Sequence, residues 1–194
     1  SRDLKKTKAW LFQNPEGMHA LLKKIAAWSI AYLKLQIEAG VDAIQIFDSW
    51  ACFLAHRQFR EFSLAYLQLL MEGIHLTSIP VILFCRGSSV FAPQLAELKP
   101  ASIGLDWNCR MSEMRRSIAP NIALQGNLDP DILHAPLASI EMETQHLLKE
   151  MDRDPGFIVN LGHGLPPDAP EVAVKTLVEY VKRWDGTCHR RFST

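Results

Sequence analysis

In the stretch Phe157-Ile158-Val159-Asn160-Leu161-Gly162-His163-Gly164, an apolar run leads directly into a histidine between two glycines. The β-branched bias of the run is typical of a buried strand. Glycine on each side frees the backbone and removes side-chain bulk, so a ligand could reach His163 at the end of the strand. A His-Gly pair alone more often marks a surface loop. The other strands predicted along the chain change that interpretation.

Four earlier stretches repeat the pattern of an apolar strand that runs into a polar or glycine-rich end and is followed by a helix. They are 43–47 before Asp48-Ser49, 80–85 before Arg86-Gly87, 102–105 before Asp106-Trp107, and 122–124 before Gln125-Gly126-Asn127. Strands buried on both faces and joined by helices predict a parallel sheet. In such folds the carboxyl ends of the strands carry the functional site.

The absence of two nucleotide-binding motifs narrows the fold class to a (β/α)8 TIM-type barrel. No GxGxxG motif follows a strand, and no GxxxxGK[ST] motif occurs. Five strand–helix units cannot close an eight-stranded barrel. We therefore expect that this chain holds only about the last five units, and that about three more precede Ser1.

The segments between the strands predict several helices and one turn. Asn14 and Pro15 are typical of a helix start, and Gly40 of a helix end. The aromatic residues of that helix, such as Trp28 and Tyr32, are interpreted as core. Further predictions are a helix over 110–116, a helix-capping turn over 127–130, a closing helix over 171–184 and a frayed tail over 185–194, within one domain spanning 1–194.

Composition and charge exclude several classes of protein. The 194 residues are 48% hydrophobic and 22% charged with zero formal net charge, which is ordinary for a globular domain and gives no field for nucleic acid or an anionic membrane surface. No apolar run approaches the roughly 20 residues of a membrane helix. Four cysteines lie far apart without a CxxC pair, so we expect no disulfide framework, no metal site and a cytoplasmic location.

Candidate site residues lie at the predicted strand ends. Ser49 could cap the following helix or donate its hydroxyl to a ligand carboxylate. His163 could donate a hydrogen bond or titrate near neutrality. Asp106 is interpreted as an ion-pair or turn carboxylate, and Arg86 as a surface residue or a partner for anionic groups.

Four motifs, in this order and spacing, resemble the uroporphyrinogen decarboxylase family, and the resemblance runs from about Thr7 to Trp184. The motifs are Ile46-Phe47-Asp48-Ser49, Gly104-Leu105-Asp106-Trp107, Leu124-Gln125-Gly126-Asn127-Leu128-Asp129-Pro130 and Asn160-Leu161-Gly162-His163-Gly164. The segment Lys8-Ala9-Trp10-Leu11 is also similar to the part of that family just before the second half of the barrel.

The resemblance implies a homodimeric (β/α)8 barrel enzyme without metal or organic cofactor. Its expected reaction removes carbon dioxide from the four acetate side chains of uroporphyrinogen III and gives coproporphyrinogen III, in haem biosynthesis. Ser49 and His163 correspond to positions that contact the carboxylates or the pyrrole rim of this porphyrinogen substrate. The arginine-rich motif, the aspartate that binds the pyrrole N–H groups and a substrate-contacting tyrosine have no counterpart here. The resemblance thus implies that no catalytic residue lies in this chain, that the expected Asp and Arg lie before Ser1, and that the chain alone catalyses little.

Two alternatives remain open beside this interpretation. A related barrel transfers methyl groups from corrinoid proteins with zinc held by a His-x-Cys motif, whereas this chain has Leu83-Phe84-Cys85 at the corresponding strand end. Zinc bound at Cys85 would favour that alternative. A non-catalytic half-barrel would instead have no affinity for porphyrins.

Overall fold

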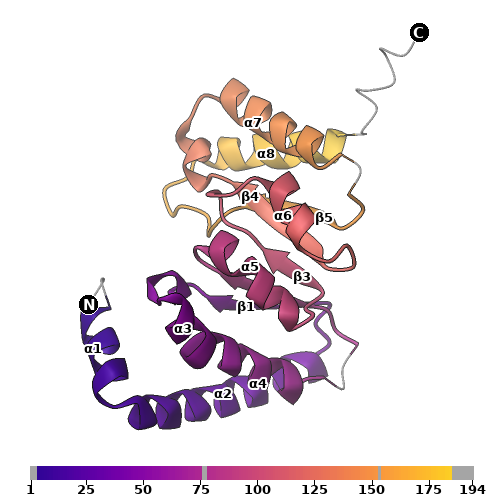
Figure 1. Ribbon diagram of the computed structural model, residues 1–194. Coiled ribbons are helices and arrows are strands. Elements are labelled where there is room, and N and C mark those ends of the chain that lie inside the picture. Colours follow the sequence, from indigo (N-terminus) through magenta and orange to yellow (C-terminus); the bar gives the residue numbers. More distant parts are fainter. Residues whose placement is uncertain (1–3, 76–77, 153, 185–194) are drawn as a thin grey trace.

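The computed structural model describes residues 4–75, 78–152 and 154–184, and these residues form a parallel sheet with helices packed on one face (Figure 1). Each strand pairs in parallel with the next one along the chain, in the order β1-β2-β3-β4-β5. The strands are β1 (Ile44–Asp48), β2 (Val81–Cys85), β3 (Ser102–Gly104), β4 (Ala123–Leu128) and β5 (Phe157–Leu161). The predicted α/β class and the five strand–helix units are confirmed.

The helices precede the first strand, connect successive strands or, in the case of α8, follow the last strand. The α-helices are α1 (Lys5–Gln13), α2 (Pro15–Glu38), α3 (His56–Phe59), α4 (Ala65–Gly73), α5 (Ser88–Glu97), α6 (Met111–Ser117), α7 (Leu137–Glu150) and α8 (Glu171–Arg183). A π-helical turn, η2 (Arg60–Leu64), joins α3 to α4, and two 3-10 helices are η1 (Ala51–Phe53) and η3 (Pro130–His134). In Figure 1, α7 and α8 lie side by side at one end of the sheet, and α1 and α2 lie at the other end.

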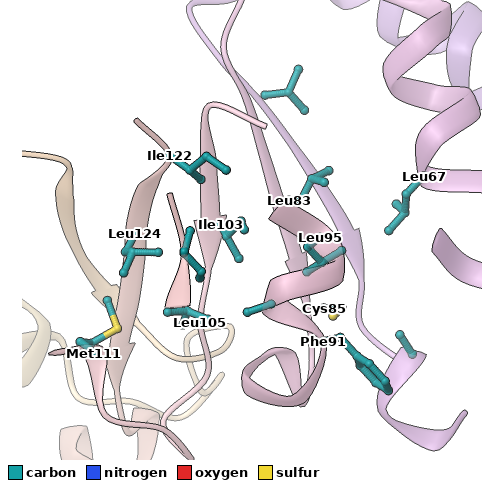
Figure 2. Packing of buried hydrophobic residues seen from close by; sticks show 14 of the residues in the cluster. Leu67, Leu83, Cys85, Phe91, Leu95, Ile103, Leu105, Met111, Ile122 and Leu124 are labelled. Carbon is teal, nitrogen blue, oxygen red and sulfur yellow. The ribbon is translucent and has the colours of Figure 1, made fainter. Parts of the chain in front are cut away.

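The core lies between the sheet and its helices. Leu83 and Ile103, from neighbouring strands, pack with Leu95 of α5, and none of the three is more than 1% exposed (Figure 2). Burial of such apolar side chains is the main stabilising contribution to a fold of this kind. Every second strand residue contributes to this layer, because successive side chains of a strand point to opposite faces.

The opposite face of the sheet is open, which corrects the expectation that the strands are buried on both faces. Phe47, Phe84, Gly104, Gln125 and Ile158 align in one row across the sheet and therefore share that face. At the two edge strands, the row ends in Phe47, which is 63% exposed, and Ile158, which is 41% exposed. A closed barrel would cover these side chains, and five strands do not close one.

Helix α2 begins and ends as predicted but does not bury its aromatic residues. The Asn14 side chain accepts a hydrogen bond from the backbone N–H of Gly17 at 2.9 Å, so it caps the helix. Trp28 and Tyr32 are 73% and 63% exposed, so their interpretation as core was wrong. The helix packs against α4 through a different stripe, which includes the buried Leu33.

The predicted turn over 127–130 is partly wrong, because β4 continues through Leu128. Asn127 pairs with Asn160 of β5 instead of entering a turn. Asp129 does cap the following helix, since its carboxylate accepts a hydrogen bond from Asp131, but that helix is the 3-10 helix η3. The helices predicted over 110–116 and 171–184 are confirmed as α6 and α8, while the tail predicted over 185–194 lies outside the described residues.

Among the helices of the described residues, none has the length and apolar character needed to cross a bilayer.

Candidate functional site

His163 lies just beyond β5, at the carboxyl-end edge of the sheet. Its ring contacts Phe84 and Trp107 edge-on, with ring centroids 6.0 Å and 6.3 Å apart. Gly162 permits this position, because a Cβ atom at residue 162 would lie 2.6 Å from the backbone nitrogen of Trp107. The close approach of the two backbones after β3 and β5 thus explains the glycine before His163.

Ser49 follows β1 and lies on the same side of the sheet as His163. Both residues line a cavity of about 370 Å³ on the open face. Its other walls include Phe47, Phe84 and Leu165, which make it largely apolar. The structure therefore brings together the two site residues predicted from sequence, although they follow the two opposite edge strands of the sheet.

Arg86 lies at the end of β2 and lines a neighbouring hollow with Trp107 and Asp129. His163 lines this hollow as well as the Ser49 cavity, so it lies between the two. The Arg86 side chain is exposed. The arrangement places a cation and an imidazole, which can bind an anionic group, next to the carboxylates of Asp129 and Asp131.

Asp106 is fully buried, and its hydrogen bonds hold the chain segment that follows β3 to the end of β4. Its carboxylate accepts a hydrogen bond from the backbone N–H of Asn108 at 3.2 Å. Its backbone carbonyl accepts another from the Asn127 side chain at 2.9 Å, and the same amide group donates to the carbonyl of Cys109 at 2.8 Å. These bonds agree with the interpretation of Asp106 as a turn carboxylate, and they join the ends of β3 and β4.

Sequence reasoning missed a pair of amide side chains that also line the cavity. The Nε2 atom of Gln125 lies 3.5 Å from the Oε1 atom of Gln45, in hydrogen-bond geometry across the open face. The two residues lie on β4 and β1, so the sheet must curve for them to meet. Alternation along each strand could have shown that both face inward. Their contact depends on curvature and is not readable from spacing.

Cys85, the residue on which the zinc alternative depends, lies on the other face of β2 from Phe84. Its side chain is 0% exposed and belongs to the core between the sheet and the helices (Figure 2). Burial raises the pKa of this thiol well above its ordinary value, which favours the protonated form over the thiolate that binds metals. Within residues 4–75, 78–152 and 154–184, no group of three or more His, Cys, Asp or Glu side chains is arranged to hold a metal ion.

The fold and the cavity define the class: a (β/α)-barrel type of protein with a candidate ligand site at the carboxyl ends of its parallel strands. Residues 1–184 match the family model described as uroporphyrinogen decarboxylase (URO-D). This chain belongs to the uroporphyrinogen decarboxylase family. The resemblance recognised in the sequence motifs is thereby confirmed.

Two curated relatives show how much of the family's length is present. A uroporphyrinogen decarboxylase of Protochlamydia amoebophila is 61% identical over 186 residues, which is 96% of this chain and 51% of that protein. A uroporphyrinogen decarboxylase of Pseudomonas aeruginosa is 38% identical over 193 residues, covering 97% of this chain and 54% of that protein. The chain therefore spans about half the length of the curated relatives it matches.

A solved structure supports the fold independently of these relatives. A methyltransferase from Methanosarcina mazei superimposes with a TM-score of 0.80 at 22% sequence identity, over 92% of this chain and 53% of that protein. At this identity the likeness concerns the fold alone.

Proposed function

We propose that this chain supplies part of the substrate site of a uroporphyrinogen decarboxylase. The reaction converts the four acetate side chains of uroporphyrinogen III to methyl groups with release of carbon dioxide, and gives coproporphyrinogen III without a metal or organic cofactor. Ser49 and His163 would contact the carboxylates or the pyrrole rim. The observation that carries the proposal is that these two residues line one cavity on the open face of the sheet.

The chemistry of the cavity suits a polycarboxylated macrocycle. Phe47, Phe84 and Leu165 provide apolar walls for the tetrapyrrole, and the hydroxyl of Ser49 and the ring of His163 provide polar contacts at its edge. Arg86, in the adjoining hollow, adds a permanent positive charge. Such an arrangement, apolar walls with a few placed polar groups, is typical of sites for large cofactor-sized ligands.

We expect this chain to bind the substrate but to catalyse little. The decarboxylation passes through a protonated pyrrole, a cation that a nearby carboxylate would stabilise. Asp106 is fully buried and engaged at the rim, and it does not line the Ser49 cavity. We therefore propose that the chain contributes binding groups, and that rapid turnover requires an aspartate and arginines that it does not supply.

The proposal also includes the cellular location and the oligomeric state of the protein. We propose a cytoplasmic location, which suits cysteines without disulfide-type spacing. We also propose a homodimer, as the resemblance implies.

An anaerobic binding titration tests the proposed substrate class. Coproporphyrinogen III is compared with octaethylporphyrinogen, which has the same macrocycle and no carboxylates. Coproporphyrinogen should bind at least about tenfold more tightly, because each charge-assisted hydrogen bond contributes about 1.5–3 kcal/mol. Equal affinities, or no binding of either compound, would refute the proposal and favour the non-catalytic alternative.

A further inference from the structure

Asp48, the last residue of β1, points away from the cavity that Ser49 lines. Its side chain shares the opposite side of the strand with Ser63, and both line a separate, mostly apolar cavity between β1 and α2. The Ser63 hydroxyl donates a hydrogen bond to the Oδ2 atom of Asp48 at 2.5 Å. The backbone N–H of Trp50 donates a second hydrogen bond to the same carboxylate. Ser49 thus lies between Asp48, whose side chain is hydrogen-bonded to Ser63, and Trp50, whose amide is hydrogen-bonded to Asp48.

The π-helical turn explains how Ser63 reaches the end of β1. This turn, η2, carries one more residue than an α-helical turn and interrupts an otherwise continuous helix from α3 to α4. Phe62, Ser63 and Leu64 are all buried. In a regular α-helix three consecutive residues spread over more than half of the circumference, whereas a π turn has more residues per turn and brings them closer to one side. Turns of this kind frequently occur at functional sites.

We propose that Asp48 and Ser63 are positioning residues that hold Ser49 in the orientation in which its hydroxyl reaches the bound ligand. The part of this inference that concerns the ligand rests on the proposed function. The geometry gives the mechanism: the carboxylate connects the helix layer to the loop after β1 at two points, Ser63 and the Trp50 amide. Loss of either point would leave the segment around Ser49 freer to rotate, and the hydroxyl would have to be ordered again on binding.

The first test measures the loop without any ligand. Amide hydrogen exchange is followed by NMR for residues 49–51 in the full chain and in Ser63→Ala. We expect exchange of the Trp50 amide to become about tenfold faster, because its acceptor is no longer held. Thr144→Val is the matched control, since it removes another buried hydroxyl that donates at 2.6 Å, far from β1 in sequence, and should leave residues 49–51 unchanged. Unchanged exchange in Ser63→Ala would overturn the inference, whatever the chain binds.

The second test asks whether the effect on binding passes through Ser49. Affinity for coproporphyrinogen III is measured for Ser63→Ala, Ser49→Ala and the double variant. We expect Ser63→Ala to weaken binding about threefold to about tenfold alone, and to have no further effect once the Ser49 hydroxyl is absent. The same fold loss in both backgrounds would mean a general structural role and would overturn the inference.

Two controls keep the inference separable from the proposed function. Asp48→Ala, which removes both acceptor oxygens, should reproduce the faster exchange if Ser63→Ala does not fold. If the unaltered chain binds no coproporphyrinogen, the proposed function fails, while the exchange experiment still decides whether Asp48 and Ser63 hold the loop. Normal exchange in the folded Asp48→Ala variant would count against the inference in the same way.

Discussion

Gly162 shows at the level of a single residue how the backbone places a site group. The backbones after β3 and β5 approach so closely that a Cβ atom at residue 162 would lie 2.6 Å from the nitrogen of Trp107. The same approach brings the Trp107 and His163 rings into edge contact. His163 can therefore take this position because its neighbour, Gly162, has no side chain.

Gly162→Ala should lower the free energy of unfolding by about 1–3 kcal/mol, the usual cost of forcing atoms into a packed site. Urea denaturation measures this change. Gly164→Ala is the matched control, because a Cβ atom at residue 164 would meet nothing within 4 Å, and its stability should stay within about 0.5 kcal/mol of the unaltered chain. Equal stability of both variants would contradict the close approach seen at Gly162.

Asp48 gives the chain a pH-dependent contribution to stability. Burial raises the pKa of its carboxyl above the ordinary value of 3.8, and the hydrogen bonds from Ser63 and Trp50 offset only part of this effect. The folded state therefore holds the proton more tightly than the unfolded state. This contribution to stability is fully present below pH 3.8 and is lost as the pH rises through the higher pKa of the folded state.

Asp48→Asn should remove that dependence. Denaturation at a series of pH values from 3.8 upward measures the slope of stability against pH. We expect the contribution that falls with rising pH to be absent in the variant, since an amide does not titrate in this range. The same slope in both proteins would show that Asp48 titrates normally in the folded state.

Some of the residue-level site was predictable from sequence and some was not. The placement of Ser49 and His163 at one edge of the sheet was predictable, because carboxyl ends of parallel strands meet there and both residues follow such ends. The Gln45–Gln125 contact depends on the curvature of the sheet, and the Asp48–Ser63 bond depends on a π turn. Neither curvature nor a local change of helix type follows from hydrophobic periodicity.

At the scale of elements, α2 carries an apolar stripe with no partner in the described chain. Leu21, Ile25, Trp28, Tyr32 and Leu35 recur every three or four residues and are each between 43% and 73% exposed. Periodicity predicted an apolar helix correctly, but it could not show which part of a broad apolar face would be covered. That depends on the elements that pack against the helix, and α4 covers only one side.

An exposed apolar stripe of this length should promote self-association of the chain. We expect sedimentation velocity to show oligomers at high concentration, and Trp28→Lys to shift the distribution toward monomer. Ala27→Lys is the matched control, because residue 27 is exposed on the same helix but lies outside the stripe, so it should leave association unchanged. Equal effects of both substitutions would point to net charge instead of the stripe, and a monomeric unaltered chain would contradict the expectation.

At the scale of the whole molecule, five parallel strands present an open, curved face instead of a closed barrel. The row from Phe47 to Ile158 crosses this face, and the cavity with Ser49 and His163 lies at its carboxyl-end rim. The barrel class was predictable, because few folds accommodate strands and helices that alternate along the chain and form a parallel sheet. The exposure of the inner face was not, because burial of a strand depends on the strands beside it.

In the proposed function, Ser49 and His163 bind one carboxylated tetrapyrrole together. The most direct test is an anaerobic titration of coproporphyrinogen III into the chain, its Ser49→Ala and His163→Ala variants, and the control His146→Ala, whose side chain is 62% exposed on α7. Each site variant should weaken binding by about tenfold or more, as loss of a hydrogen bond to a charged group would, and His146→Ala should leave the affinity unchanged. Unchanged affinity in both site variants would contradict the proposed function.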